Sequence, residues 1–154
     1  MNGVYDLPDE AALVAFGERL ADAIKVDPRP RIILLQGDLG VGKTTLARAL
    51  IRRLTGNPAE EVPSPTFTLL QDYAAPANGG HIPIRHYDLY RLKSPDEVYE
   101  LGWEETLENG AKGGLSLVEW PERLGSLLPQ TAIKIDLLIA PGSDMRKVQI
   151  QGWF

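Results

Sequence analysis

A glycine-rich turn between an apolar run and an amphipathic stretch limits most strongly what this chain can fold into. Residues 37–44 read Gly-Asp-Leu-Gly-Val-Gly-Lys-Thr, which matches the Gly-x-x-x-x-Gly-Lys-Thr pattern of a Walker A phosphate-binding loop. The run 32–35 before it is typical of a buried strand, and leucines at 46, 50 and 54 recur after it at helical spacing. Because such a loop requires a strand before it and a helix after it, the chain is predicted to be an α/β protein that binds a nucleoside triphosphate.

The residues of this loop have separate roles in binding phosphate. Glycines allow backbone conformations that a side chain would forbid, so the N–H groups of residues 40–45 can point inward at an anion. The positive end of the following helix adds to the same attraction. We expect Lys43 to reach the β- and γ-phosphates and the Thr44 hydroxyl to bind Mg²⁺. The predicted phosphate-binding residues are Gly37, Asp38, Gly40, Val41, Gly42, Lys43, Thr44 and Thr45.

Two carboxylates follow strand-like segments further along the chain. Asp88 comes soon after one such segment, and Glu119 ends another in the position of a Walker B carboxylate. Ligands of open α/β sheets bind at the carboxyl ends of strands, so Glu119 is expected to face the phosphates. Asp88 and Glu119 are therefore predicted to act with Lys43 in catalysis and with Thr44 in holding Mg²⁺. Which carboxylate orients the attacking water stays open.

Three nearby residues each have a structural and a functional interpretation. Residue type favours packing for Trp120 over stacking on a base, and His86 is interpreted as a hydrogen-bonded structural histidine. In the segment 62–70, prolines on both sides of Ser64 hold it and its neighbours extended, and Thr66 offers a hydroxyl on that stiff loop. The loop either orders around the γ-phosphate and Mg²⁺ or is a plain turn, and its spacing favours neither.

Composition excludes several classes of site. The 154 residues are predicted to form one domain, 1–154, and the absence of cysteine excludes disulfides and cysteine-bound metal centres. The start of the chain lacks the pattern of a signal peptide and no apolar run approaches the length of a membrane span, so we expect a cytoplasmic protein without a membrane partner. The net charge of −5 disfavours general attraction to nucleic acid. Arg48, Arg52 and Arg53 are interpreted as a solvated helix face.

The remaining segments predict a mixed sheet. Residues 1–7 suit an edge strand, residues 8–10 a helix start, and the alternating segment 131–139 forms a hairpin with 146–153. Residues 74–80 are small and glycine-rich, so they are interpreted as a hairpin tip. Residues 94–97, Ser-Pro-Asp-Glu, predict a helix start with a capping box. The predicted fold is a three-layer P-loop NTPase fold whose sheet is mostly parallel, with antiparallel additions at the edges.

Four segments, taken in order, resemble the bacterial TsaE (YjeE) family. They are the phosphate loop 37–44, Ser-Pro-Thr-Phe at 64–67, His-Tyr-Asp-Leu-Tyr-Arg at 86–91 and Glu-Trp-Pro at 119–121. The helix starts at 7–10 and 95–97 also look like that family, so the resemblance covers nearly the whole chain. The glycine-rich tip at 74–80 looks long for the family, which leaves partner contacts less defined than the motif residues.

The resemblance implies an activity and partners. Members are small ATPases that use ATP and Mg²⁺ and bind the TsaB–TsaD heterodimer, which makes the threonylcarbamoyl modification of the adenosine beside the tRNA anticodon. The tRNA itself is then contacted only indirectly, through the complex. By resemblance, Thr66 lies in a switch-like loop and Trp120 lies near the nucleotide. The segment 7–10 would line the base, which makes Glu10 a predicted nucleotide contact.

The sequence leaves three other functions to compare with ATP hydrolysis in support of the heterodimer. None of the four asparagines begins the Asn-Lys-x-Asp motif that reads guanine, which disfavours a GTPase. A small-molecule kinase needs an acceptor pocket and usually an arginine-bearing lid, and only Arg91 supports that alternative. A nucleotide-gated binding subunit without turnover is the third, in which Asp88→Ala would leave partner binding unchanged.

Overall fold

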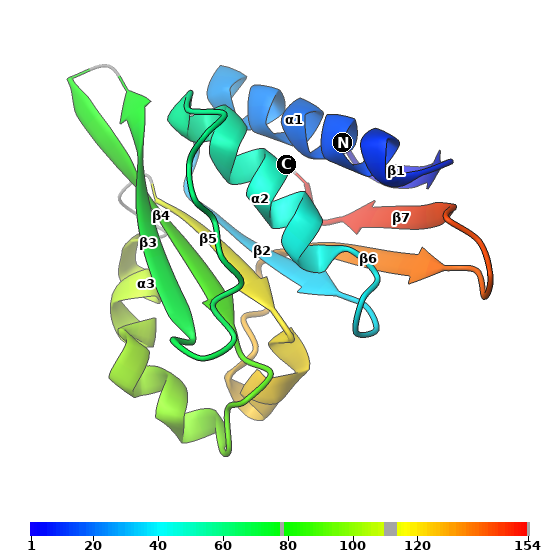
Figure 1. The fold of residues 1–154 in the computed structure, drawn as a ribbon. Helices are drawn as coiled ribbons and strands as arrows, with labels where there is room; N and C mark the ends of the chain where they lie inside the picture. Colours follow the sequence, from blue (N-terminus) through cyan, green and yellow to red (C-terminus); the bar gives the residue numbers. More distant parts are fainter. Residues whose placement is uncertain (78, 110–113, 154) are drawn as a thin grey trace.

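The chain forms a seven-stranded sheet with helices on both faces (Figure 1), as described by a computed structural model for residues 1–77, 79–109 and 114–153. The strands are β1 (Gly3–Leu7), β2 (Arg31–Gln36), β3 (Leu70–Ala77), β4 (Gly80–Asp88), β5 (Leu115–Glu119), β6 (Ile133–Ile139) and β7 (Arg146–Gln151). The α-helices are α1 (Glu10–Val26), α2 (Lys43–Thr55) and α3 (Trp103–Asn109), and the 3₁₀ helices are η1 (Pro95–Leu101) and η2 (Pro121–Leu127). No helix within these described ranges is long and apolar enough to cross a membrane.

The centre of the sheet is parallel and its edges are antiparallel. Across the sheet the strand order is β1-β7-β6-β2-β5-β4-β3, and the neighbours β6, β2, β5 and β4 run parallel. Strands β1 and β7 on one side and β3 on the other pair antiparallel. This arrangement confirms the predicted mixed sheet. It also brings the carboxyl ends of four parallel strands to one edge, where ligands bind in sheets of this kind.

Helices α1 and α2 cover one face of the sheet. Leu13, Phe16 and Leu20 of α1 are at most 1% exposed, as their helical spacing predicts, and they share a core with Leu46 and Leu50 of α2. In Figure 1 the two helices lie side by side on the same side of the sheet. Burying this apolar stripe is what fixes α2, and hence the phosphate loop that precedes it, against β2.

Helices η1, α3 and η2 cover the opposite face. Trp103 is fully buried and meets Tyr87 edge to face, with ring centres 5.4 Å apart. Val98 and Leu124 complete this second core against Leu34 of β2 and its neighbours. Because β2 alternates its side chains between the two cores, its apolar run is buried on both faces.

Two local predictions about helix starts have opposite outcomes. Helix α1 begins at Glu10, within the predicted helix start 8–10, and Asp9 caps it, because its Oδ1 accepts a hydrogen bond of 2.8 Å from the backbone N–H of Ala12. The capping box at Ser94 is wrong, since the Ser94 side chain makes no capping bond. Residues 95–101 form a 3₁₀ helix instead, in which the N–H of Glu97 bonds the carbonyl of Ser94 at 3.2 Å.

The predicted hairpin tip at 74–80 is also wrong in its extent. Strand β3 continues to Ala77 and β4 begins at Gly80, and these two residues pair with each other. Residue 78 lies outside the described residues. The small side chain of Ala75 is 4% exposed and belongs to the core beside α2. The small residues that suggest a loop therefore form a strand that packs closely against this core.

Helices α1 and α2 approach closely at Gly17, and valine there is expected to lower the free energy of unfolding by about 2–3 kcal/mol. A Cβ atom at Gly17 would lie 2.9 Å from the Cβ of Ala49 and 3.0 Å from the carbonyl oxygen of Leu46. Urea unfolding followed by circular dichroism measures the loss. Ala15→Val, on the exposed side of the same helix, is the matched control and should cost only about half a kcal/mol. Equal stabilities of the two variants would contradict close packing of the helices.

Candidate nucleotide-binding site

The phosphate loop needs glycine at two of its positions for steric reasons. Gly37 has φ 152° and Gly42 has φ 114°, which are backbone conformations that residues with a side chain rarely adopt. A Cβ atom at Gly37 would lie 2.7 Å from the carbonyl oxygen of Leu137, and one at Gly42 would lie 2.6 Å from Cδ2 of Leu13. The loop is thus wedged between β6 and α1, and this packing fixes its shape before any ligand binds.

Lys43, the first residue of α2, is drawn into the loop. Its side chain is 5% exposed, and its ammonium group donates to the carbonyl oxygens of Gly37 and Asp38. The same nitrogen lies 4.0 Å from the centre of the Trp120 ring. Burial lowers the pKa of Lys43, and the carboxylate of Glu119 acts in the opposite direction. A cation so poorly hydrated attracts an incoming phosphate more strongly than one in open water would.

Glu119 is held on both of its carboxylate oxygens. The hydroxyl of Thr44 donates to Oε1 at 2.8 Å, and Nε2 of His86 lies 2.6 Å from Oε2. Glu119 is 2% exposed and ends β5, so the structure places it beside the phosphate loop at the predicted Walker B position. The hydrogen bond between Thr44 and Glu119 joins the two residues predicted to hold Mg²⁺.

Asp88 lies beside Glu119, because the two residues are register partners at the ends of β4 and β5. Its Oδ2 accepts hydrogen bonds from the hydroxyls of Thr66 at 3.1 Å and Ser64 at 3.3 Å. Its Oδ1 accepts from the backbone N–H of Tyr90 at 3.0 Å. The loop 64–67 therefore reaches the end of the sheet and contacts a carboxylate of the site. Its spacing in the sequence does not decide between this arrangement and a plain turn.

Two arginines of α2 hold the chain that leads into this loop. Nε of Arg48 donates to the carbonyl oxygen of Val62, and Nε of Arg52 donates to that of Glu60, both at 3.0 Å. Only Arg53 is exposed, and it pairs with Asp22 of α1 at 2.9 Å. The interpretation of all three as a solvated face is wrong for Arg48 and Arg52, because their side chains donate to backbone carbonyls of the irregular segment that follows α2.

Most of the predicted site residues line one pocket with about 270 Å³ of space at the carboxyl ends of β2, β4 and β5, but Gly37, Asp38 and Val41 do not line it. Trp120 and Tyr90 form one side of it, with ring centres 4.9 Å apart. Trp120 has φ 58°, a left-handed conformation that is uncommon for a bulky residue and turns its ring toward Lys43. The pocket is lined by Leu39, Gly40, Gly42, Lys43, Thr44, Thr45, Ser64, Thr66, Asp88, Tyr90, Glu119 and Trp120.

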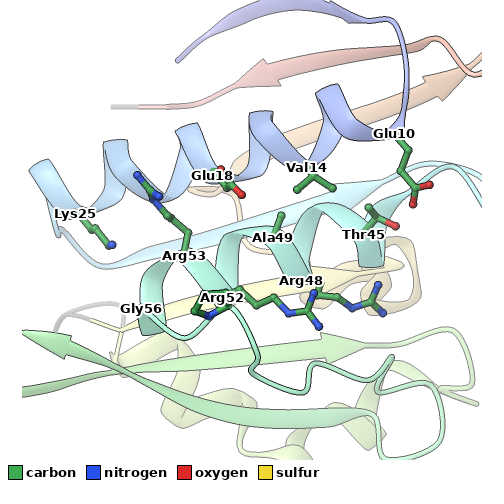
Figure 2. Close-up of a pocket in the computed structure, with 11 residues that line it drawn as sticks. Glu10, Val14, Glu18, Lys25, Thr45, Arg48, Ala49, Arg52, Arg53 and Gly56 are labelled. Carbon is green, nitrogen blue, oxygen red and sulfur yellow. The ribbon is translucent and has the colours of Figure 1, made fainter.

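A larger pocket, of about 470 Å³, lies between α1 and α2 and away from the carboxylates (Figure 2). Glu10 lines this second pocket and not the first, while Thr45 lines both. In Figure 2 Glu10 stands at the end of α1 closest to Thr45. The structure therefore brings Glu10 near the start of the phosphate-loop helix without bringing it to Lys43, and its contact with a nucleotide stays a prediction.

The donor atoms of the first pocket suit Mg²⁺. Thr44 offers a hydroxyl oxygen and Asp88 and Glu119 offer carboxylate oxygens, which are the hard ligands that this ion prefers. Among the residues that the structure describes, no group of three or more His, Cys, Asp or Glu side chains could hold a metal by itself. The set fits an ion that arrives with phosphates and keeps several waters, as Mg²⁺ usually does at nucleotide sites.

Comparisons with known proteins agree with one another. The family model "Threonylcarbamoyl adenosine biosynthesis protein TsaE" matches residues 7–148. Proteins named tRNA threonylcarbamoyladenosine biosynthesis protein TsaE from Rickettsia bellii and Rickettsia typhi are 43% and 46% identical to this chain, over 89% and 88% of it and 87% and 86% of their own lengths. The crystal structure of YdiB from Bacillus subtilis superposes with a TM-score of 0.68 at 26% identity, covering 97% of this chain and 84% of that one.

Proposed function

This chain belongs to the TsaE family, and on that premise we propose that it is an ATPase that binds ATP with Mg²⁺ and hydrolyses it in support of a TsaB–TsaD heterodimer. The family is involved in threonylcarbamoyladenosine biosynthesis of tRNA. One observation supports hydrolysis above the others. Lys43 and Thr44 of the phosphate loop line the same pocket as the adjacent carboxylates Asp88 and Glu119. A protein that only bound nucleotide would not need two buried carboxylates at the phosphates.

In the proposed mechanism each residue has one task. The backbone N–H groups of the loop bind the phosphates, and the Lys43 ammonium offsets the charge that builds on the γ-phosphate. Thr44 and Glu119, which are hydrogen-bonded to each other, would hold Mg²⁺, and the ion would supply further neutralisation of the phosphate charge. Asp88, oriented by Thr66, aligns the attacking water.

Trp120 and Tyr90 have a shielding role in this proposal. Their rings lie 4.9 Å apart along one side of the pocket, and the Trp120 ring covers the ammonium of Lys43. An apolar wall at this position keeps water away from the cation, which strengthens its attraction to phosphate. We propose that Trp120 is near the bound nucleotide for this reason, without assigning it a stacking contact to the base.

The proposed partners can be tested together with the reaction. Phosphate release from ATP and Mg²⁺ is expected to be slow for the protein alone and faster when the TsaB–TsaD heterodimer is added, because the loop 64–67 is open to a partner at Phe67, which is 81% exposed. Lys43→Ala is the blank and should release no phosphate with or without the heterodimer. tRNA should change the rate only when the heterodimer is present, since it is proposed to act through that complex.

Two results would contradict the proposal. A phosphate-release rate that is the same with and without the heterodimer would contradict the proposed partner, while ATP hydrolysis by this protein would still stand. Transfer of phosphate to an added nucleoside or sugar, in place of free inorganic phosphate, would establish a kinase. Both products are measured in the same reaction, so the two alternatives are separated by one experiment.

A further inference from the structure

His86 is buried directly behind one of the two carboxylates of the site. It lies on β4, two residues before Asp88, and its side chain is 0% exposed. Nε2 of the imidazole is 2.6 Å from Oε2 of Glu119, a short hydrogen bond between two side chains that are almost completely shielded from water. The other oxygen of the same carboxylate accepts from Thr44.

The partners of the two ring nitrogens show which of them donates to Glu119. A carboxylate can only accept, so the hydrogen of this bond belongs to Nε2 of His86. Nδ1 is buried and has no hydrogen-bond partner among the residues that the structure describes. Nδ1 therefore does not compete with Nε2 for a hydrogen-bond partner, and the ring donates to Glu119 through its Nε2–H.

We propose that His86 is a positioning residue that, as an Nε2–H donor, fixes the carboxylate of Glu119 so that its other oxygen faces Thr44 and the metal. The proposal rests on the proposed function for the role of Glu119. Without this donor the carboxylate could rotate about its last bond and leave Thr44. Hydrogen-bond partners of metal-binding carboxylates commonly have this function.

Glutamine and methionine make a matched pair of substitutions at His86. Both are unbranched and of similar length, but only the glutamine amide can donate near the place of Nε2. His86→Met is expected to lower kcat about tenfold to a hundredfold and to raise by a similar factor the Mg²⁺ concentration that gives half the maximal rate. His86→Gln should keep both quantities within about threefold of the wild-type values, since it restores the donor.

Two further measurements do not depend on turnover. Calorimetric titration gives the ratio of ATP affinities with and without Mg²⁺, and that ratio should fall about tenfold in His86→Met and stay near wild type in His86→Gln. In the unliganded wild-type protein, ¹⁵N-edited NMR of the histidines should show the hydrogen of His86 on Nε2. This last experiment needs no variant, so it applies even when a substitution at a buried position prevents folding.

The outcomes separate this proposal from the broader one. Equal kcat and equal Mg²⁺ dependence in the two variants, whether both are normal or both impaired, would overturn the positioning role, and so would a ring that carries no hydrogen on Nε2. If the wild-type protein hydrolyses no ATP, the proposed ATPase fails, while the calorimetric ratio and the NMR measurement still test His86. Loss of Mg²⁺-dependent affinity in His86→Met, restored in His86→Gln, would support the role in that case as well.

Discussion

Lys43→Met is expected to lower the rate of ATP hydrolysis about a thousandfold. The lysine ammonium is buried beside Trp120 and bonded to two loop carbonyls, so it is already aimed at the loop that binds the phosphates. Charge that develops on the γ-phosphate is stabilised most by a cation that does not have to move or shed water during the reaction. Methionine keeps an unbranched side chain in the same space and removes the charge together with its hydrogen bonds to the loop carbonyls. The rate of phosphate release with ATP and Mg²⁺ in excess measures the effect.

The control for this variant is Lys25→Met, which removes a lysine from the exposed far end of α1. Its rate should match that of the wild type. Thermal unfolding should show that Lys43→Met is folded, with a midpoint within a few degrees of wild type, because removing a buried charge also removes the cost of burying it. A folded Lys43→Met protein that hydrolyses ATP at the wild-type rate would show that Lys43 does not act on the phosphates.

The phosphate loop shows why part of the site is predictable from the sequence. Its residues are contiguous, and a loop of this pattern binds phosphate largely through its own backbone, so one short segment specifies both the geometry and the proposed chemistry. The steric need for Gly37 and Gly42 is visible only in the structure, because the atoms that would clash belong to β6 and α1. The α/β fold follows for a related reason, since the loop requires a strand and a helix at its two ends.

The contacts around the carboxylates depend on strand order, which the sequence does not reveal directly. Asp88 and Glu119 are 31 residues apart in the numbering and become register partners only because β4 and β5 are parallel neighbours. His86 reaches Glu119 for the same reason. His86 and Asp88 are two residues apart, so strand alternation places both side chains on one side of β4. That pattern does not identify the carboxylate with which His86 forms its hydrogen bond. A structural role for His86 is thus predictable, and its partner is not.

Contacts that involve irregular segments of the backbone are the hardest to predict from the sequence. Arg48 and Arg52 look like a solvated helix face because arginine at such spacing usually is one, yet they bond the carbonyls of Val62 and Glu60. Ser94 fits a capping pattern, but the 3₁₀ turn that follows uses its backbone and not its hydroxyl. In both cases the tertiary path of the backbone overrides a local preference.

Glu119→Gln and Asp88→Asn are each expected to lower kcat about a hundredfold or more, but with different dependence on Mg²⁺. Glu119 accepts from Thr44 on one oxygen and from His86 on the other. An amide has one accepting oxygen and no charge. If that oxygen keeps the bond from His86, the amide NH₂ replaces the carboxylate oxygen beside Thr44, and the proposed Mg²⁺ site loses a negatively charged oxygen. We therefore expect Glu119→Gln to raise the Mg²⁺ concentration for half-maximal rate about tenfold or more.

Asp88→Asn should leave the Mg²⁺ concentration for half-maximal rate close to the wild-type value, because the groups around Asp88 can also form hydrogen bonds with an amide. The hydroxyls of Ser64 and Thr66 can rotate to accept from an amide as readily as they donate to a carboxylate, and the amide oxygen can still accept from the N–H of Tyr90. What Asp88→Asn loses is the charge that aligns the attacking water, and hence kcat. Rates measured across a Mg²⁺ titration separate the two variants. The reverse pattern, with Mg²⁺ dependence altered in Asp88→Asn alone, would assign the water to Glu119 and the metal to Asp88.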